Sequence, residues 1–173
     1  MRNSTAPHNW ISVTLTLLAM SLPPFAAAEP FRIGREDIIE LRANSAWEDE
    51  APDVVHFSGR FEMRVRDWVL LSDRATVRGP LEDPEFVEVE GQPARMQLAR
   101  GTEDQPRPIT AEALRIVYER DGKHVLLEGA AVMVQGESTL RSNLIEYELE
   151  TDRLHASGES GVRMSLPWSK SAQ

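Results

Sequence analysis

Histidine, serine and carboxylate side chains are the groups in this chain that could perform nucleophilic, acid–base or metal chemistry. Of the four histidines, His56 and His155 each precede a glycine by three residues, and His124 follows an Asp-Gly pair. None has a second ligand at the spacing that metal sites use, so we expect surface histidines and no bound metal. Ser160 lies in the run Gly158-Glu159-Ser160-Gly161, which lacks the spacing of a nucleophile elbow. These residues therefore predict no catalytic centre.

The carboxylates occupy the polar positions of strand-like stretches. The clearest examples are Glu62, Glu88, Glu90, Glu128, Glu146 and Glu148. Alternate residues of a strand lie on the same face, so these side chains are expected on a solvated outer face. Solvation explains them without an acid–base role. We therefore predict that the protein is not an enzyme and needs no cofactor.

The stretches that position these residues have the period of β-strands. From Val55 to Val65 every second residue is apolar or glycine, and the residues between them are polar. Similar alternation recurs around residues 116–118, 145–149 and 162–164, and Asp121-Gly122 is a strong hairpin signal. Helical periodicity is almost absent after the N-terminal segment. The sequence predicts an all-β fold.

Four strand-like stretches of the chain run into a glycine, at Gly59, Gly91, Gly129 and Gly158. The glycines lie 32, 38 and 29 residues apart. Such recurrence is typical of a stack of similar units, each of which needs a neighbour to bury its apolar face. Two interpretations of the glycines stay open: they ease bends in a curved sheet, or they are ordinary hairpin residues.

The apolar positions change parity in one stretch. They are odd through Val87, Val89 and Gly91, and even at Ala94 and beyond. A face cannot change parity unless the strand bulges or restarts, and the intervening Gln92-Pro93 predicts such a break because proline cannot donate to the ladder.

A sheet with one apolar face and no helix to cover it must close or fold over on itself. Strands of five to eight residues would number roughly 12 to 16. A sealed core and a groove that adapts to a guest both fit this pattern, since periodicity does not separate them. The interior would be lined by Phe57, Phe61, Met63, Val65, Val89, Met96, Leu98, Ile116, Tyr118, Leu127, Met133, Ile145, Tyr147, Leu149 and Leu154.

The first 28 residues differ from the rest. Arg2 precedes an apolar stretch from Trp10 to Leu22, followed by paired prolines and small residues up to Ala28. This order predicts a cleaved secretory signal, with cleavage before Glu29, and hence export. A retained membrane anchor is the alternative, which the polar residues and prolines of the segment disfavour.

Charge and cysteine content exclude several classes of protein. The formal net charge is −9 and no basic block is present, so we expect no nucleic-acid partner. The chain contains no cysteine, which excludes disulfides and a lipid-modified N-terminal cysteine.

The chain also resembles a known family over roughly residues 38–164. Six runs carry the resemblance, in the same order and spacing: Ile39–Ala46, Val55–Gly59, Glu90–Ala94, Ile109–Tyr118, Leu127–Val132 and Leu140–Tyr147. Together they resemble the LptA/OstA-like domain family of periplasmic lipopolysaccharide-transport bridge proteins.

The resemblance implies a folded-over antiparallel β-jelly roll, open along one side. It places a signal peptide at 1–28, an N-terminal extension at 29–37, the OstA-like domain at 38–166 and a C-terminal tail at 167–173. Acyl chains of lipopolysaccharide would lie against the fifteen interior residues given above. At about 25 cal/mol per Å² of apolar surface buried, such chains can outweigh the repulsion of an anionic headgroup by an acidic protein.

The resemblance further implies a periplasmic role in outer-membrane biogenesis of Gram-negative cells. Partners would be lipopolysaccharide, inner- and outer-membrane transport proteins with related domains, and further copies stacked head to tail through the terminal strands, Ile38–Leu41 and Val162–Leu166. Pro167 would end the last strand. A membrane-anchored assembly partner of the same fold and a sealed β-solenoid, acting as a scaffold or carbohydrate-binding module, remain alternatives.

Overall fold

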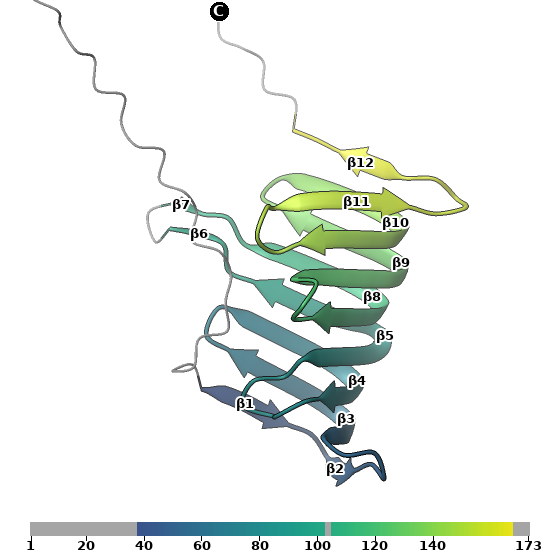
Figure 1. Cartoon of the computed structure of the whole chain (residues 1–173). Helices are drawn as coiled ribbons and strands as arrows, with labels where there is room; N and C mark the ends of the chain where they lie inside the picture. Colours follow the sequence, from purple (N-terminus) through teal and green to yellow (C-terminus); the bar gives the residue numbers. More distant parts are fainter. Residues whose placement is uncertain (1–37, 103–104, 168–173) are drawn as a thin grey trace, which may run out of the picture.

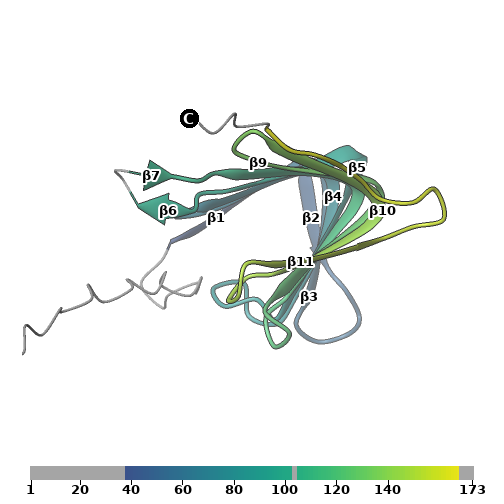
Figure 2. The same cartoon turned by 90° about the horizontal axis from the view of Figure 1, so that it is seen from above.

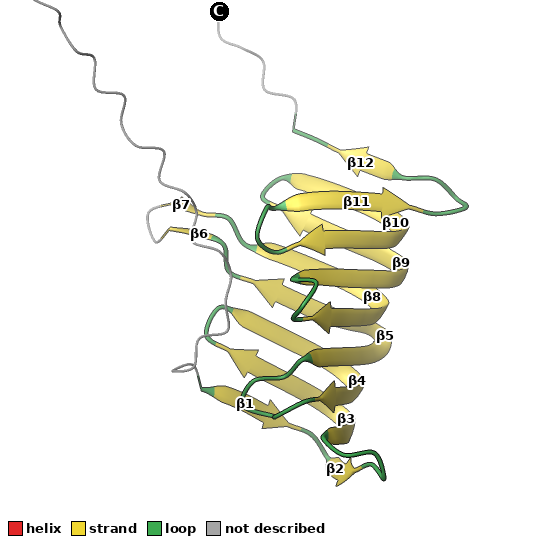
Figure 3. Cartoon of the chain, in the orientation of Figure 1, coloured by secondary structure: helices red, strands yellow, loops and turns green. Residues whose placement is uncertain are grey.

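The computed structural model of the chain describes residues 38–102 and 105–167. These residues form strands, turns and loops, and no helix occurs among them (Figure 3). Nothing in these two ranges is therefore a helix that could cross a bilayer. The strands are β1 (Ile39–Arg42), β2 (Ser45–Glu48), β3 (Val54–Val65), β4 (Trp68–Arg78), β5 (Phe86–Leu98), β6 (Gly101–Thr102), β7 (Gln105–Pro106), β8 (Ile109–Glu119), β9 (His124–Gln135), β10 (Ser138–Glu148), β11 (Arg153–Ser157) and β12 (Arg163–Ser165).

Ten of the strands form one antiparallel sheet (Figure 1). Its order is β1-β3-β4-β5-β8-β9-β10-β11, with β2 paired to β3 and β12 paired to β10. Strands β6 and β7 form a separate small hairpin. Within the described ranges the first strands do not pair with the last, so the sheet stays open. The predicted all-β, folded-over and open architecture is confirmed.

The sheet folds into two arms because its long strands bend. Strands β3, β4, β5, β8, β9 and β10 have 11 to 13 residues each, and each contributes one half to each arm. The first arm contains β1, β12 and the halves that lie in line with them, and the second arm contains β2, β11 and the other halves. Seen along the stack, the arms form a V (Figure 2).

The recurrent glycines mark the bend. The pairing of β3 with β4 shifts register between Ser58 and Phe61, and the skipped residues Gly59 and Arg60 have φ of 78° and 50°. Gly129 and Ala130 repeat this geometry in β9, with φ of 79° and 50°. These backbone angles are ones that glycine adopts without steric cost, and they turn a strand sharply.

The other two glycines also belong to the bend. Gly91 lies in β5, where the register shifts between Glu90 and Ala94, so the break predicted at Gln92-Pro93 is confirmed as a bulge. Gly158 follows the last residue of β11 and approaches Asn143, which is skipped in the pairing of β10. The bend interpretation of the glycines is therefore correct and the hairpin interpretation is wrong.

The predicted strand length is wrong for the six long strands. A bulge bends a strand without ending its hydrogen-bonded ladder, so stretches that alternation divides into two strands are one strand here. The described part of the chain has twelve strands in all, the lowest number in the predicted range.

Candidate lipid-binding interior

The facing surfaces of the two arms are apolar along the whole stack. Cross-strand pairing aligns one inward residue from each strand into rows that run across the strands. One row of the second arm contains Phe57, Ala75, Val89, Ile116, Leu127, Ile145 and Ala156. Because neighbours in such a row lie opposite each other on adjacent strands, every strand adds to one continuous apolar surface.

The first arm carries a row rich in flexible side chains, which we call the methionine row. It consists of Leu41, Met63, Leu70, Met96, Ala111, Met133, Leu140 and Met164. Methionine is unbranched and polarisable, so it adapts to irregular neighbours better than branched side chains do. The row extends from one edge of the sheet to the other.

The structure brings together fourteen of the fifteen residues predicted to line the interior. Each of the fourteen is at most 7% exposed, and all belong to one hydrophobic cluster. Leu154 is the exception, at 39% exposed, because it lies on the terminal strand β11. The side chains of the two arms pack on one another, so the interior is closed by protein in this structure. Its role in lipid binding remains a prediction.

Sequence reasoning missed several interior residues, of which Trp68, Leu70 and Ile109 are the largest that are almost completely buried. Each is at most 1% exposed. The indole ring of Trp68 packs edge-on against Tyr118, with ring centroids 4.9 Å apart. Alternation at positions 68 and 70, and at 109, 111 and 113, was the available signal. The charged residues immediately before Trp68 obscured it.

The described interior contains almost no polar side chains. No charged or strongly polar side chain of the described residues is fully buried. The only two tyrosines of the chain, Tyr118 and Tyr147, both lie in the cluster. Burial raises the pKa of both phenols; that of Tyr147 rises to about 12, with a hydrogen bond from its hydroxyl to Asp152 as the second cause. Both phenols therefore stay protonated at neutral pH, and the described interior is lined mainly by apolar side chains.

Comparison with known proteins decides the family. The model of the LptA/(LptD N-terminal domain) LPS transport protein family matches residues 40–153. This range runs from the second residue of β1 to the first residue of β11, and so covers nearly all of the folded sheet. The chain belongs to this LptA/LptD N-terminal family.

Individual members of the family agree with this assignment. The lipopolysaccharide export system protein LptA of Escherichia coli K12 is 24% identical over 152 residues, which cover 87% of this chain and 78% of the relative. The LptA protein of Shigella flexneri gives the same values. Among solved structures, LptH from Pseudomonas aeruginosa, the LptA-homologous periplasmic component of a lipopolysaccharide transport device, superimposes with a TM-score of 0.67. It shares 21% identity, over 77% of this chain and 97% of LptH.

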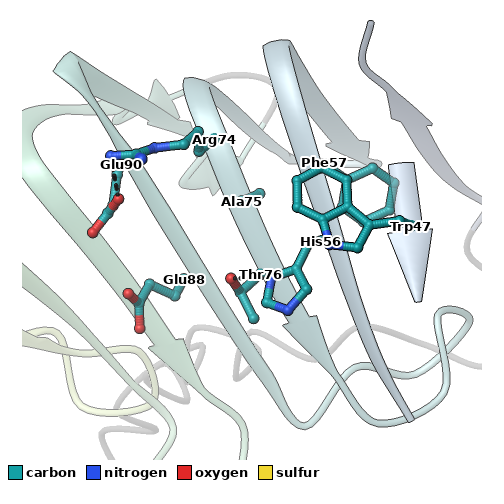
Figure 4. A pocket seen from close by; sticks show the side chains of 8 residues that line it. All are labelled: Trp47, His56, Phe57, Arg74, Ala75, Thr76, Glu88 and Glu90. Atoms are coloured by element: carbon teal, nitrogen blue, oxygen red, sulfur yellow. Dashed lines mark hydrogen bonds and ion pairs between the residues drawn. The ribbon is translucent and has the colours of Figure 1, made fainter. Parts of the chain in front are cut away.

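A pocket lies on the second arm, mostly among side chains of its outer face (Figure 4). It has a volume of about 390 Å³ and is lined by Trp47, His56, Phe57, Arg74, Ala75, Thr76, Glu88 and Glu90. The charged groups around it are already paired: Arg74 lies 3.0 Å from Glu90, and Glu88 lies 2.7 Å from Arg115. This pairing lowers the pKa of Glu88. The hollow is consistent with a solvated outer face.

His56 lies on that outer face, as predicted. Its Nε2 atom is 2.7 Å from Asp49, its Nδ1 atom is 3.1 Å from Thr76, and the ring stacks on Trp47. The pKa of Asp49 is lowered, mainly by the backbone N–H of Ala51 and then by His56. Both ring nitrogens thus have local partners. In the part of the chain that the structure describes, no three His, Asp or Glu residues are grouped to hold a metal ion.

Proposed function

We propose that this protein binds lipopolysaccharide in the periplasm and takes part in its transfer between the inner and outer membranes, without acting as an enzyme. Membership of the family is the observation that carries this proposal. Both the E. coli and Shigella relatives are lipopolysaccharide export proteins, and LptH is a periplasmic transport component. The predicted signal peptide lies outside the described residues and agrees with export.

The acyl chains are the part of the lipid that the interior suits. The two arms present apolar rows to each other, and the charged groups of the sheet lie on the outer faces. Since fourteen of the fifteen predicted residues are almost fully covered by one another, chains can enter only if the arms separate. Contacts between side chains are then exchanged for contacts with the lipid, which keeps the apolar surface out of water.

The two ends of the sheet support end-to-end association. Of the eight large apolar residues that are exposed in the described ranges, six lie at these ends: Ile38 and Trp47 at one end, and Leu154, Val162, Met164 and Leu166 at the other. Among the described strands, β1 and β2, like β11 and β12, also have one edge without a partner strand. A stacked copy, or a related domain of a membrane partner, would cover these side chains and pair these edges.

Two adjacent residues provide a direct test of the lipid site. Met133 faces the interior and is 2% exposed, whereas Val132 precedes it on the outer face of the same strand. A photo-crosslinking amino acid is placed at each position, and the mature protein is irradiated with lipopolysaccharide. We expect crosslinked lipid from position 133 and little from position 132.

Crosslinking from both positions alike would contradict an interior site. If neither position crosslinks lipid, and native mass spectrometry detects no bound lipid, the sealed β-solenoid would be favoured. N-terminal sequencing of the exported protein checks the predicted cleavage of the signal peptide, because a cleaved signal leaves Glu29 as the first residue.

A further inference from the structure

Arg100 connects the tips of the two arms across the open side of the fold. It lies two residues beyond the end of β5, at the tip of the first arm. Its Nη2 atom donates a hydrogen bond to the carbonyl oxygen of Leu149, just beyond the end of β10 in the second arm. The same atom lies 3.3 Å from the Oδ1 atom of Asp152. The Arg100 side chain is only 13% exposed, although it belongs to a loop.

On the second arm, the two residues that accept from this guanidinium, Asp152 and Leu149, are held in place by further hydrogen bonds. The Tyr147 hydroxyl donates to Asp152, and the Leu149 N–H donates to the carbonyl oxygen of Lys123. The guanidinium carbon lies 5.9 Å from the centroid of the Tyr147 ring. Arg100 therefore sits over a residue of the interior cluster, at the boundary between water and the apolar interior.

Three other ion pairs at the tips lie within one arm. Arg120 pairs with Asp83 and Glu85, and Lys123 pairs with Glu150, all within the second arm. These pairs join neighbouring turns and do not restrain the separation of the arms. The contacts of Arg100 do restrain it, since they join residues 49 positions apart on opposite arms.

We propose that Arg100 is a latch residue, which holds the arms together over the interior and releases Asp152 when the anionic group of an entering lipid takes its place. The planar guanidinium binds carboxylate and phosphate through the same fork of N–H donors, so a phosphate at the mouth competes directly with Asp152. With its chains between the arms, a lipid must leave its headgroup at this boundary. The lipid part of the proposal rests on the proposed function; the closing of the arms by Arg100 does not.

The closing role is tested without lipid. The chain has no cysteine, so spin labels at Glu137→Cys and Asp121→Cys report the distance between exposed turns of the two arms. We expect Arg100→Gln to raise the population of separated arms by about tenfold, the size of effect that losing a charged hydrogen bond produces. Asp152→Asn should act in the same direction.

Arg107→Gln is the matched control, because Arg107 is an exposed arginine of the same arm and its replacement changes the net charge equally. It should leave the distances as in the wild type. Unchanged distances in both Arg100→Gln and Asp152→Asn, or an equal change in Arg107→Gln, would overturn the latch. Circular dichroism of each variant checks that the sheet is retained.

The exchange of partners is tested with two lipids of identical chains, a bisphosphorylated lipid A analogue and its dephosphorylated form. The wild type should separate its arms at a severalfold lower concentration of the phosphorylated lipid, and Arg100→Gln should lose this preference. A preference that persists in Arg100→Gln would refute the exchange. If neither lipid binds while the lipid-free distances still respond to Arg100→Gln, the proposed function fails and the latch stands.

Discussion

The rings of Phe57 and Phe61 lie 5.2 Å apart between their centroids, although the two residues are four positions apart along one strand. In a straight strand the two positions would be about 13 Å apart. The bulge at Gly59 and Arg60 folds β3 between them, so one ring lies on each arm and the two meet at the inside of the bend. This contact joins the arms at the vertex of the V.

Phe61→Ala should therefore destabilise the fold strongly. The side chain is 1% exposed, and truncation of a buried phenylalanine costs about 3–5 kcal/mol. Leu114→Ala is the control, because Leu114 is a large apolar residue that is 52% exposed. Urea unfolding of both variants measures the difference. A loss below about 1 kcal/mol for Phe61→Ala would mean that the arms do not depend on this contact.

Gly59→Ala should destabilise the protein more than Gly136→Ala. Both glycines have positive φ, so alanine is strained at either position. At Gly59 the added Cβ would also lie 2.9 Å from the Cβ and Cγ atoms of Asn44, whereas nothing lies within 4 Å at Gly136. Asn44 cannot easily move away, because its N–H donates to the Gly59 carbonyl.

We expect the Gly59→Ala variant to unfold at a clearly lower urea concentration than the Gly136→Ala variant. Equal midpoints would show that the bend accommodates a side chain, contrary to the crowding described above.

The two tyrosines should make the fold sensitive to alkaline pH. An unfolded tyrosine has a pKa of about 10, and burial raises the pKa of Tyr147 to about 12. Because the folded state keeps the proton longer, the stability contributed by Tyr147 is complete below pH 10. It is lost as pH rises toward 12, by an amount of the order of 2 kcal/mol.

The ultraviolet absorbance of tyrosinate measures this effect. Between pH 10 and pH 12 the native protein should show less tyrosinate than the urea-unfolded chain, and Tyr147→Phe should reduce the alkaline loss of stability. Native and unfolded proteins that titrate together would contradict the burial of both phenols.

Met164→Glu should weaken self-association. Met164 lies at the end of the methionine row, is 55% exposed and would be covered by a stacked copy. A buried, unpaired carboxylate is unfavourable, so the charge disfavours stacking. Leu114→Glu places the same charge at a similarly exposed residue away from the ends. Native mass spectrometry over a range of concentrations should show fewer oligomers for Met164→Glu alone.

Much of the fold was predictable, because the interior consists of simple alternation. The parity change around Gln92-Pro93 predicted a bulge, and Phe61 and Met133 were correctly placed inside. Strand lengths were not predictable, since alternation does not reveal whether a ladder continues through a bulge. The contact of Arg100 with Asp152 was also beyond reach, because it depends on how far two arms of a folded sheet lean toward each other.

The methionine row has a consequence for motion along the stack. Its eight members lie on eight successive strands, so neighbouring positions are separated by one strand spacing of about 4.8 Å, and the row is roughly 34 Å long. A flexible hydrocarbon shifted by one such step meets a similar surface of thioether and aliphatic groups. The methionine row is therefore periodic in the direction of the stack, so an acyl chain bound there as proposed would meet no position that differs sharply from its neighbours.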